Sequence, residues 1–221
     1  MKEVDDALEN NDIIVEGDTD NVQIEPAELL KLFKQVWLNE KMAPELLPHR
    51  DDIVCCLLDE LNRLDQELMG GHRADLSVSL RKMDIERLRY ILADYLRVRT
   101  VKIEKFCFSI SDRDENSKLS EKEINYLIQY KQDLEEHLKK SAVDNMPGNA
   151  KKLKYEQIAS QANLHHYVFA RVLPEKSVKN LLVDGADEQS EELVDLEENT
   201  QHLLPYKYIS GNLDDGDVCL M

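Results

Sequence analysis

The chain has 221 residues, 42% of them apolar, which is enough for a core and for one ordinary domain plus a small one. Its formal charge of −17 belongs to its ends, because residues 1–24 carry −7, residues 184–221 carry −10 and the body between them is neutral. A neutral body argues against broad, salt-driven binding to nucleic acid or to an anionic membrane, which needs a basic face.

The beginning of the chain is acidic and has no apolar h-region, and no apolar run approaches 18 residues. We therefore expect neither a signal peptide nor a membrane span. The four cysteines form no C-x-x-C pair, and the chain has no N-x-[ST] acceptor site. These features favour a reduced, intracellular protein whose thiols serve packing.

Residues 1–24 are polar and acidic apart from Ile13, Ile14 and Val15, and their composition predicts a disordered tail. One interpretation is a solvated arm. The other is a short acidic and apolar peptide, around Val4 to Val15, that folds onto a partner. Only a binding assay separates the two.

Residues 25–146 are expected to form a helical domain. The first helix opens at Glu25-Pro26, with proline in the favoured first turn, and its apolar face includes Trp37 as a core residue. A second helix is predicted from about Asp51 to Met69, where Gly70-Gly71 ends it.

The run from Leu76 to Phe106 contains no Gly or Pro and keeps helical periodicity throughout, so it predicts one long third helix. Its apolar side chains fall on an arc of roughly 160°, wider than one neighbouring helix covers. We therefore expect that part of this helix packs on another chain. The candidate core and subunit-interface residues are Trp37, Leu88, Ile91, Leu92, Tyr95, Arg99, Ile103 and Phe106.

Arg99 lies in the middle of this apolar arc, between the directions of Leu88 and Ile103. A charge at such a position is costly unless a carboxylate meets it. The sequence therefore predicts that Arg99 is buried and paired.

Cys107 to Lys118 is polar and loses periodicity, which predicts a loop. Ser120 followed by Glu123 forms a capping box that opens a fourth helix reaching about Asp144. The expected fold is mainly α, with an amino-terminal antiparallel bundle of about four helices and a long third helix, followed by a small carboxy-terminal β domain.

Residues 147–164 are expected to be a linker and residues 165–221 the small β domain. Within it, alternating or apolar runs predict short strands at 167–172, 181–183, 193–196 and 218–220. At about 55 residues such a domain is barely stable alone, so we expect it to dock on something.

No motif for catalysis or cofactor binding stands out. The glycines form neither G-x-G-x-x-G nor G-x-x-x-x-G-K, no Glu stands three residues before a His as a di-iron bundle requires, and adjacent His165 and His166 would point to opposite faces of a strand. We expect no catalytic residue, no cofactor and no metal.

The third helix also carries Arg81, Arg87, Arg89, Arg97 and Lys102. A helical module that binds single-stranded DNA directly would use them, but their directions spread around the helix and form no single stripe. Salt bridges to neighbouring helices or subunits are the favoured interpretation.

Several spaced motifs resemble the Sld-five family of subunits of the GINS replication complex. They are residues 36–47 (VWLNEKMAPELL), 83–90 (MDIERLRY), 95–99 (YLRVR), 102–106 (KIEKF), 166–169 (HYVF) and 201–207 (QHLLPYK). The motifs occur in one order, and the resemblance covers roughly residues 26–220.

This resemblance implies a non-catalytic scaffold subunit in a heterotetramer with the three Psf subunits. In that family the tetramer joins the MCM helicase ring and the Cdc-forty-five protein in the replicative helicase, which acts in initiation and fork progression. It also implies a nuclear protein that meets DNA only indirectly and needs no membrane. ATP hydrolysis belongs to MCM, which agrees with the absence of a catalytic motif.

Overall fold

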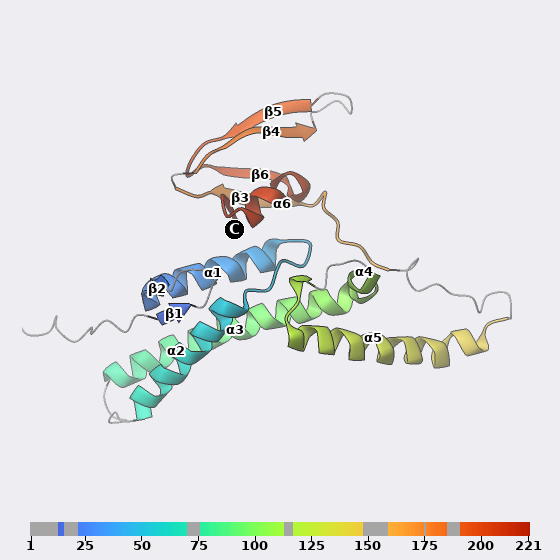
Figure 1. The fold of residues 1–221 in the computed structure, drawn as a ribbon, viewed down its shortest axis with the longest axis horizontal. Helices are drawn as coiled ribbons and strands as arrows, with labels where there is room; N and C mark the ends of the chain where they lie inside the picture. Colours follow the sequence, from blue (N-terminus) through green and yellow to red (C-terminus); the bar gives the residue numbers. More distant parts are fainter. Residues whose placement is uncertain are drawn as a thin grey trace, which may run out of the picture. The chain divides into compact units, whose positions relative to one another are not determined.

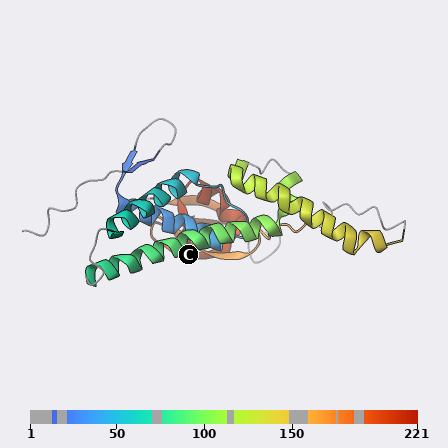
Figure 2. The ribbon, with the colours of Figure 1, turned by 90° about the horizontal axis from the view of Figure 1, so that it is seen from below.

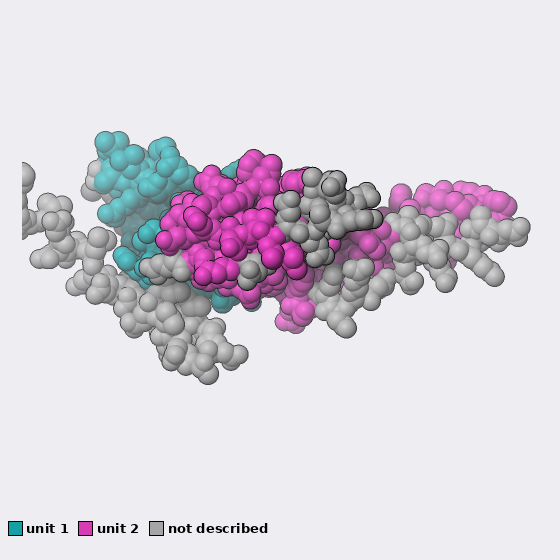
Figure 3. Space-filling model, turned by 90° about the horizontal axis from the view of Figure 1, so that it is seen from above, with its two compact units in different colours: residues 1–37, 50–96 teal, residues 38–49, 97–221 magenta. Residues whose placement is uncertain are grey.

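The structure is a computed structural model, and it describes residues 13–15, 22–69, 76–112, 117–147, 159–174, 176–184 and 191–221. Cα packing divides the chain into two compact units (Figure 3). Unit 1 comprises residues 1–37 and 50–96, and unit 2 comprises residues 38–49 and 97–221. The division cuts two helices, so each of them contributes to both units.

The described residues of the helical part form five α-helices (Figure 1). They are α1 (Pro26–Met42), α2 (Asp51–Met69), α3 (Leu76–Lys105), α4 (Cys107–Asp112) and α5 (Glu121–Ser141), followed by the 3-10 turn η2 (Val143–Asn145). The predicted long helix is present over 30 residues. The predicted loop after it was wrong in its first half, because α4 continues the helical path there.

The core of unit 1 lies where α1, α2 and α3 meet, and α2 and α3 run alongside each other in opposite chain directions (Figure 2). An aliphatic stripe repeats along α2 at helical spacing and is buried at Ile53, Leu57 and Leu61. Phe33 of α1 packs edge-on against Tyr95 of α3, with ring centroids 5.7 Å apart. Such burial is the main source of stability of these helices.

The helical part of unit 2 has its own core around the last turns of α3, α4 and α5. Its buried members are Leu46, Ile103, Phe106, Cys107, Ile110, Leu119 and Leu127. The capping box that opens α5 is confirmed, because the Glu123 amide donates to Ser120 Oγ and the Ser120 amide donates to the Glu123 carboxylate.

The strands of unit 2 form two antiparallel sheets. One sheet has the order β6-β3-β7, and the other pairs β4 with β5. The elements are β3 (Tyr167–Val172), β4 (Val178–Asp184), β5 (Glu191–Leu196), β6 (Gln201–Pro205), helix α6 (Tyr206–Asp214) and β7 (Val218–Leu220). Four of these strands were predicted, whereas β6 and α6 were not.

Helix α6 and both sheets share one apolar core. Tyr206, Ile209 and Leu213 of α6 are buried there with Val168 and Ala170 of β3. The mainly helical fold with a small carboxy-terminal sheet domain is confirmed.

A short hairpin precedes α1 in unit 1 (Figure 2). Strands β1 (Ile13–Val15) and β2 (Val22–Ile24) pair with Ile13 opposite Ile24. Both fall inside the segment that was expected to be a disordered tail. The rest of that tail, residues 1–12 and 16–21, and residues 148–158 of the predicted linker lie outside the described residues.

Candidate functional site: the two faces of helix α3

The apolar arc that the sequence predicted on α3 is covered largely by other residues of the same chain. Leu92 and Tyr95 are buried in the core of unit 1, and Ile103 and Phe106 are buried in the helical core of unit 2. Leu88 and Ile91 are partly buried and pack against the unit 1 core. These residues therefore serve the fold, and their predicted part in a subunit interface stays a prediction.

Trp37, the single tryptophan, is anchored in the same core of unit 1. Its indole Nε1 donates a hydrogen bond of 2.9 Å to the carboxylate of Asp94 on α3, and Asp94 is itself buried. A buried carboxylate is costly to leave without a donor. The pair therefore fixes the position of α1 relative to α3 within this unit.

Arg99 is fully buried and meets two carboxylates, as its position in the arc predicted. Its Nη1 donates to Glu40 Oε2 at 3.0 Å, and its Nε and Nη2 donate to the two carboxylate oxygens of Glu123 at 2.7 and 2.9 Å. The remaining donors bond the carbonyls of Leu47 and Lys118 at 2.8 and 3.0 Å. A guanidinium with five such acceptors has exchanged its water for protein partners.

Lys102, one helical turn after Arg99, completes the cluster. Its Nζ donates to the Glu40 carboxylate at 2.7 Å, to the Glu45 carbonyl at 2.8 Å and also to the Glu40 carbonyl. Burial lowers the pKa of Lys102, and the Glu40 carboxylate opposes that shift. Two cations and two carboxylates thus balance each other, with His49 Nδ1 3.7 Å from Glu123.

Arg99 and Lys102 together hold the backbone of residues 40–47, which connects α1 to the turn before α2. This segment also contacts the β domain of unit 2. Ala43 and Leu47 join the apolar core around α6, and Asn39 Oδ1 accepts a hydrogen bond of 2.9 Å from the Leu220 amide of β7. The cluster is therefore a structural site that organises unit 2.

The opposite face of α3 carries apolar side chains that stay exposed. Along unit 1 they are Leu76, Leu80, Met83 and Tyr90, with 72%, 54%, 54% and 61% of their surface accessible. Their spacing of three, four and seven residues puts them in one stripe along the helix. This stripe was not predicted from the sequence, although its helical spacing is visible there.

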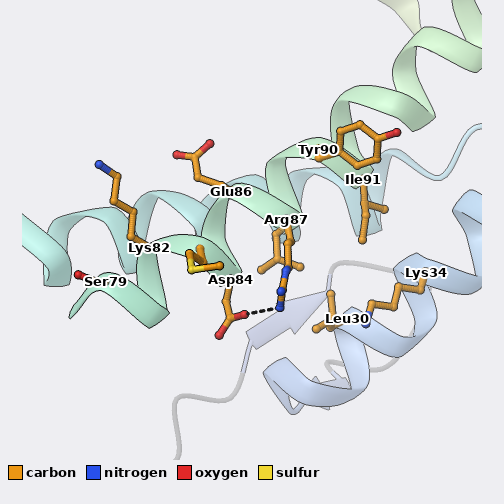
Figure 4. Close-up of a pocket in the computed structure, with 11 residues that line it drawn as sticks. Leu30, Lys34, Ser79, Lys82, Asp84, Glu86, Arg87, Tyr90 and Ile91 are labelled. Carbon is orange, nitrogen blue, oxygen red and sulfur yellow. Dashed lines mark hydrogen bonds and ion pairs between the residues drawn. The ribbon is translucent and has the colours of Figure 1, made fainter. Parts of the chain in front are cut away.

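A groove of about 960 Å³ lies beside this stripe in unit 1, between α1 and α3. Figure 4 shows Leu30 and Lys34 of α1 facing Arg87, Tyr90 and Ile91 of α3 across it. The remaining lining residues are Ser79, Lys82, Met83, Asp84, Glu86 and Leu88. An apolar groove rimmed by charges of both signs is typical of a surface that takes an amphipathic helix.

Most of the basic side chains on α3 that a nucleic-acid interface would need are engaged by carboxylates. Arg87 pairs with Asp84, and Arg89 pairs with Glu86 and with Asp65 of α2. Lys102 is occupied in the buried cluster. Arg89 and Lys102 thus form the bridges between helices that the sequence favoured, whereas Arg87 pairs within α3.

Among the described residues, no group of three or more His, Cys, Asp or Glu side chains is placed to hold a metal ion. In the same part of the chain, no helix is long and apolar enough to cross a membrane.

Comparison with known proteins assigns both parts of the chain. Residues 57–142 match the model of the GINS complex protein helical bundle domain, and residues 163–221 match that of the DNA replication complex GINS protein SLD5 carboxy-terminus. The protein named DNA replication complex GINS protein SLD5 is 38% identical in Rattus norvegicus, over 92% of this chain and 93% of its own length. The Homo sapiens protein of that name is 37% identical over 93% and 95%, and the Schizosaccharomyces pombe protein is 27% identical over 94% and 100%.

A helical bundle domain followed by this small β domain defines a subunit of the GINS DNA replication complex. The chain belongs to the SLD5 family of these subunits. The family resemblance seen in the sequence motifs is confirmed.

Proposed function

We propose that this chain is a non-catalytic scaffold subunit of a GINS heterotetramer, in which it binds the three Psf subunits. Through that tetramer it helps to join the MCM helicase ring and the Cdc-forty-five protein in the replicative helicase, in the nucleus, with DNA contacted only indirectly. Membership of the SLD5 family supports this role.

The observation that carries the proposal is the exposed stripe of α3 with the groove beside it. Met83 and Tyr90 are each more than half exposed, and they line the groove together with Leu30 and Ile91. Burial of these side chains against a partner stabilises the complex, by about 25 cal/mol for each Å² of apolar surface removed from water. The groove is therefore the candidate binding site for a helix of a Psf subunit.

The test is assembly of the coexpressed tetramer with single charge substitutions. Met83→Asp and Tyr90→Asp place a carboxylate in the groove, so we expect each to reduce recovery of the four-subunit complex at least about tenfold, because burying an unpaired charge costs several kcal/mol. Met69→Asp is the matched control, since Met69 of α2 is 90% exposed and does not line the groove.

Two results would contradict the proposed function. Assembly of Met83→Asp and Tyr90→Asp at the level of the Met69→Asp control would remove the groove from the interface. ATP hydrolysis by the purified tetramer without MCM would contradict the non-catalytic role.

The tail residues Ile13, Ile14 and Val15 stay candidates for binding a replisome adaptor.

A further inference from the structure

The sheet β6-β3-β7 has one face covered by α6 and one face that carries exposed apolar side chains. Burial alternates along β3, so Val168, Ala170 and Val172 point into the core while Tyr167 and Phe169 are 61% and 57% exposed. This alternation follows from the two-residue period of a strand. Water on one side of a sheet is ordinary, but polar side chains are then expected there.

The exposed apolar side chains form a row across β6 and β3 that reaches the residue following β7. Phe169 is the register partner of Leu203 on β6, which is 52% exposed. On the other side of Phe169, the Met221 amide donates to the Phe169 carbonyl at 3.0 Å, so Met221 extends the same row just beyond β7. Tyr167 follows two residues along the same face. We call Tyr167, Phe169, Leu203 and Met221 the sheet patch.

The domain that carries the sheet patch is acidic as a whole, although Arg171, the next outward-facing residue of β3, adds one positive charge to this face. Residues 165–221 contain twelve acidic and four basic residues, a formal charge of −8. Two acidic turns flank the end of β3, because the Val172 amide donates to the Thr200 carbonyl and the Leu173 amide donates to the Asp217 carbonyl. The exposed carboxylates of these turns are Glu197, Glu198, Asp214 and Asp215.

We propose that the sheet patch is a docking surface for a basic polypeptide, one that places apolar or aromatic anchors on Phe169 and Leu203 and Lys or Arg side chains beside the acidic turns. Aromatic residues on a sheet face also serve as stacking platforms for single-stranded nucleic acid. The charge of −8 repels a phosphate backbone, and it attracts a cationic chain. The patch belongs to unit 2, so the proposal does not depend on the α3 groove of unit 1.

The experiment is selection of a phage-displayed random twelve-residue peptide library on the immobilised full-length chain. We expect the enriched peptides to carry a net positive charge and at least two large apolar residues. The double variant Phe169→Ser with Leu203→Ser should weaken their binding at least about tenfold, as loss of central apolar anchors does. Circular dichroism checks that each variant keeps its fold.

A matched control uses Leu182 and Leu193, a register pair of the β4-β5 sheet that is 52% and 65% exposed. Leu182→Ser with Leu193→Ser should leave binding of the selected peptides unchanged. Glu197→Gln with Glu198→Gln should weaken binding and reduce its dependence on salt, because exposed charges act through a screened field.

Three results would overturn the proposal. The first is that selection on the unmodified chain enriches no peptides, or only acidic peptides, compared with selection on the Phe169→Ser, Leu203→Ser variant. The second is tight binding of a thirty-nucleotide oligothymidylate that this variant abolishes, which would make the patch a nucleic-acid platform. The third is self-association of the full-length chain that the same variant abolishes, which would make the occupant a second copy.

Discussion

Arg99 shows how one side chain can organise its surroundings. A buried guanidinium is tolerated here because Glu40 and Glu123 supply opposite charge and because backbone carbonyls take its remaining donors. Such a cluster adds little net stability compared with an apolar core of the same volume. Its consequence is specificity, since it fixes residues 40–47 in one arrangement.

Replacing Arg99 should be strongly destabilising. Arg99→Ala removes the Arg99 donors from Glu123 and from Glu40 Oε2 and leaves two backbone carbonyls without that partner, so we expect a loss of about 3–5 kcal/mol in the free energy of unfolding. Chemical denaturation of the full-length chain, followed by circular dichroism, measures it. Arg97→Ala is the control, because Arg97 is exposed on the same helix. A loss below about 1 kcal/mol would mean that the cluster relaxes without cost.

Glu123 makes the free energy of unfolding of the chain depend on pH in the acidic range. Burial alone would raise the pKa of this carboxyl, but the hydrogen bonds and charge of Arg99 outweigh burial and hold the pKa below its ordinary value of 4.5. A depressed pKa contributes stability above about pH 4.5 that is lost as the pH falls through the folded value. Urea titrations from pH 7 to pH 3 should therefore show a smaller acid-induced loss for Glu123→Gln than for the unmodified chain. Equal losses in both would contradict this assignment.

At the scale of elements, local signals located α1, α2, α3 and α5, because each spans at least 17 residues and carries either a capping signal or a sustained period. Helix α4 has six residues, too few to show a period, and its existence depends on burial of Cys107 and Ile110 in the unit 2 core. Helix α6 was hidden by Gly211 and by the surrounding acidic, turn-like residues.

The capping box offers a test at this scale. Ser120→Ala removes the side-chain acceptor for the Glu123 amide, so we expect a loss of about 1 kcal/mol in the free energy of unfolding. The comparison is Ser160→Ala, at an exposed position outside any helix or strand. Denaturation midpoints at equal slope give the difference. An unchanged midpoint in Ser120→Ala would show that water replaces the cap at no cost.

At the scale of the whole molecule, residues 38–49 contact the β domain within unit 2. Asn39 accepts from the edge strand β7, and Ala43 and Leu47 enter the core around α6. A domain of this size gains stability when it docks on a neighbour. The sequence predicted that the small β domain docks on a neighbour, and residues 38–49 of the same chain provide part of that contact.

Loss of the Asn39 acceptor should be visible at one amide. Asn39→Ala removes the hydrogen bond to the Leu220 amide, worth about 1 kcal/mol, so exchange of that amide with deuterium should accelerate several-fold. Exchange at Phe169, in the middle of the sheet, serves as the internal reference. Equal protection of Leu220 in the variant and in the unmodified chain would contradict a role for Asn39 in holding β7.

By itself, the sequence determined the helical domain, the long third helix, the capping box, four of the strands, the burial of Arg99 and the family resemblance. These features are encoded locally, by periodicity, by turn residues or by one charge inside an apolar arc. Only the tertiary structure decided which carboxylates meet Arg99, because Glu40 and Glu123 lie 59 and 24 residues away from it in the chain. It also decided which apolar face of α3 stays open, since exposure depends on what the rest of the chain covers.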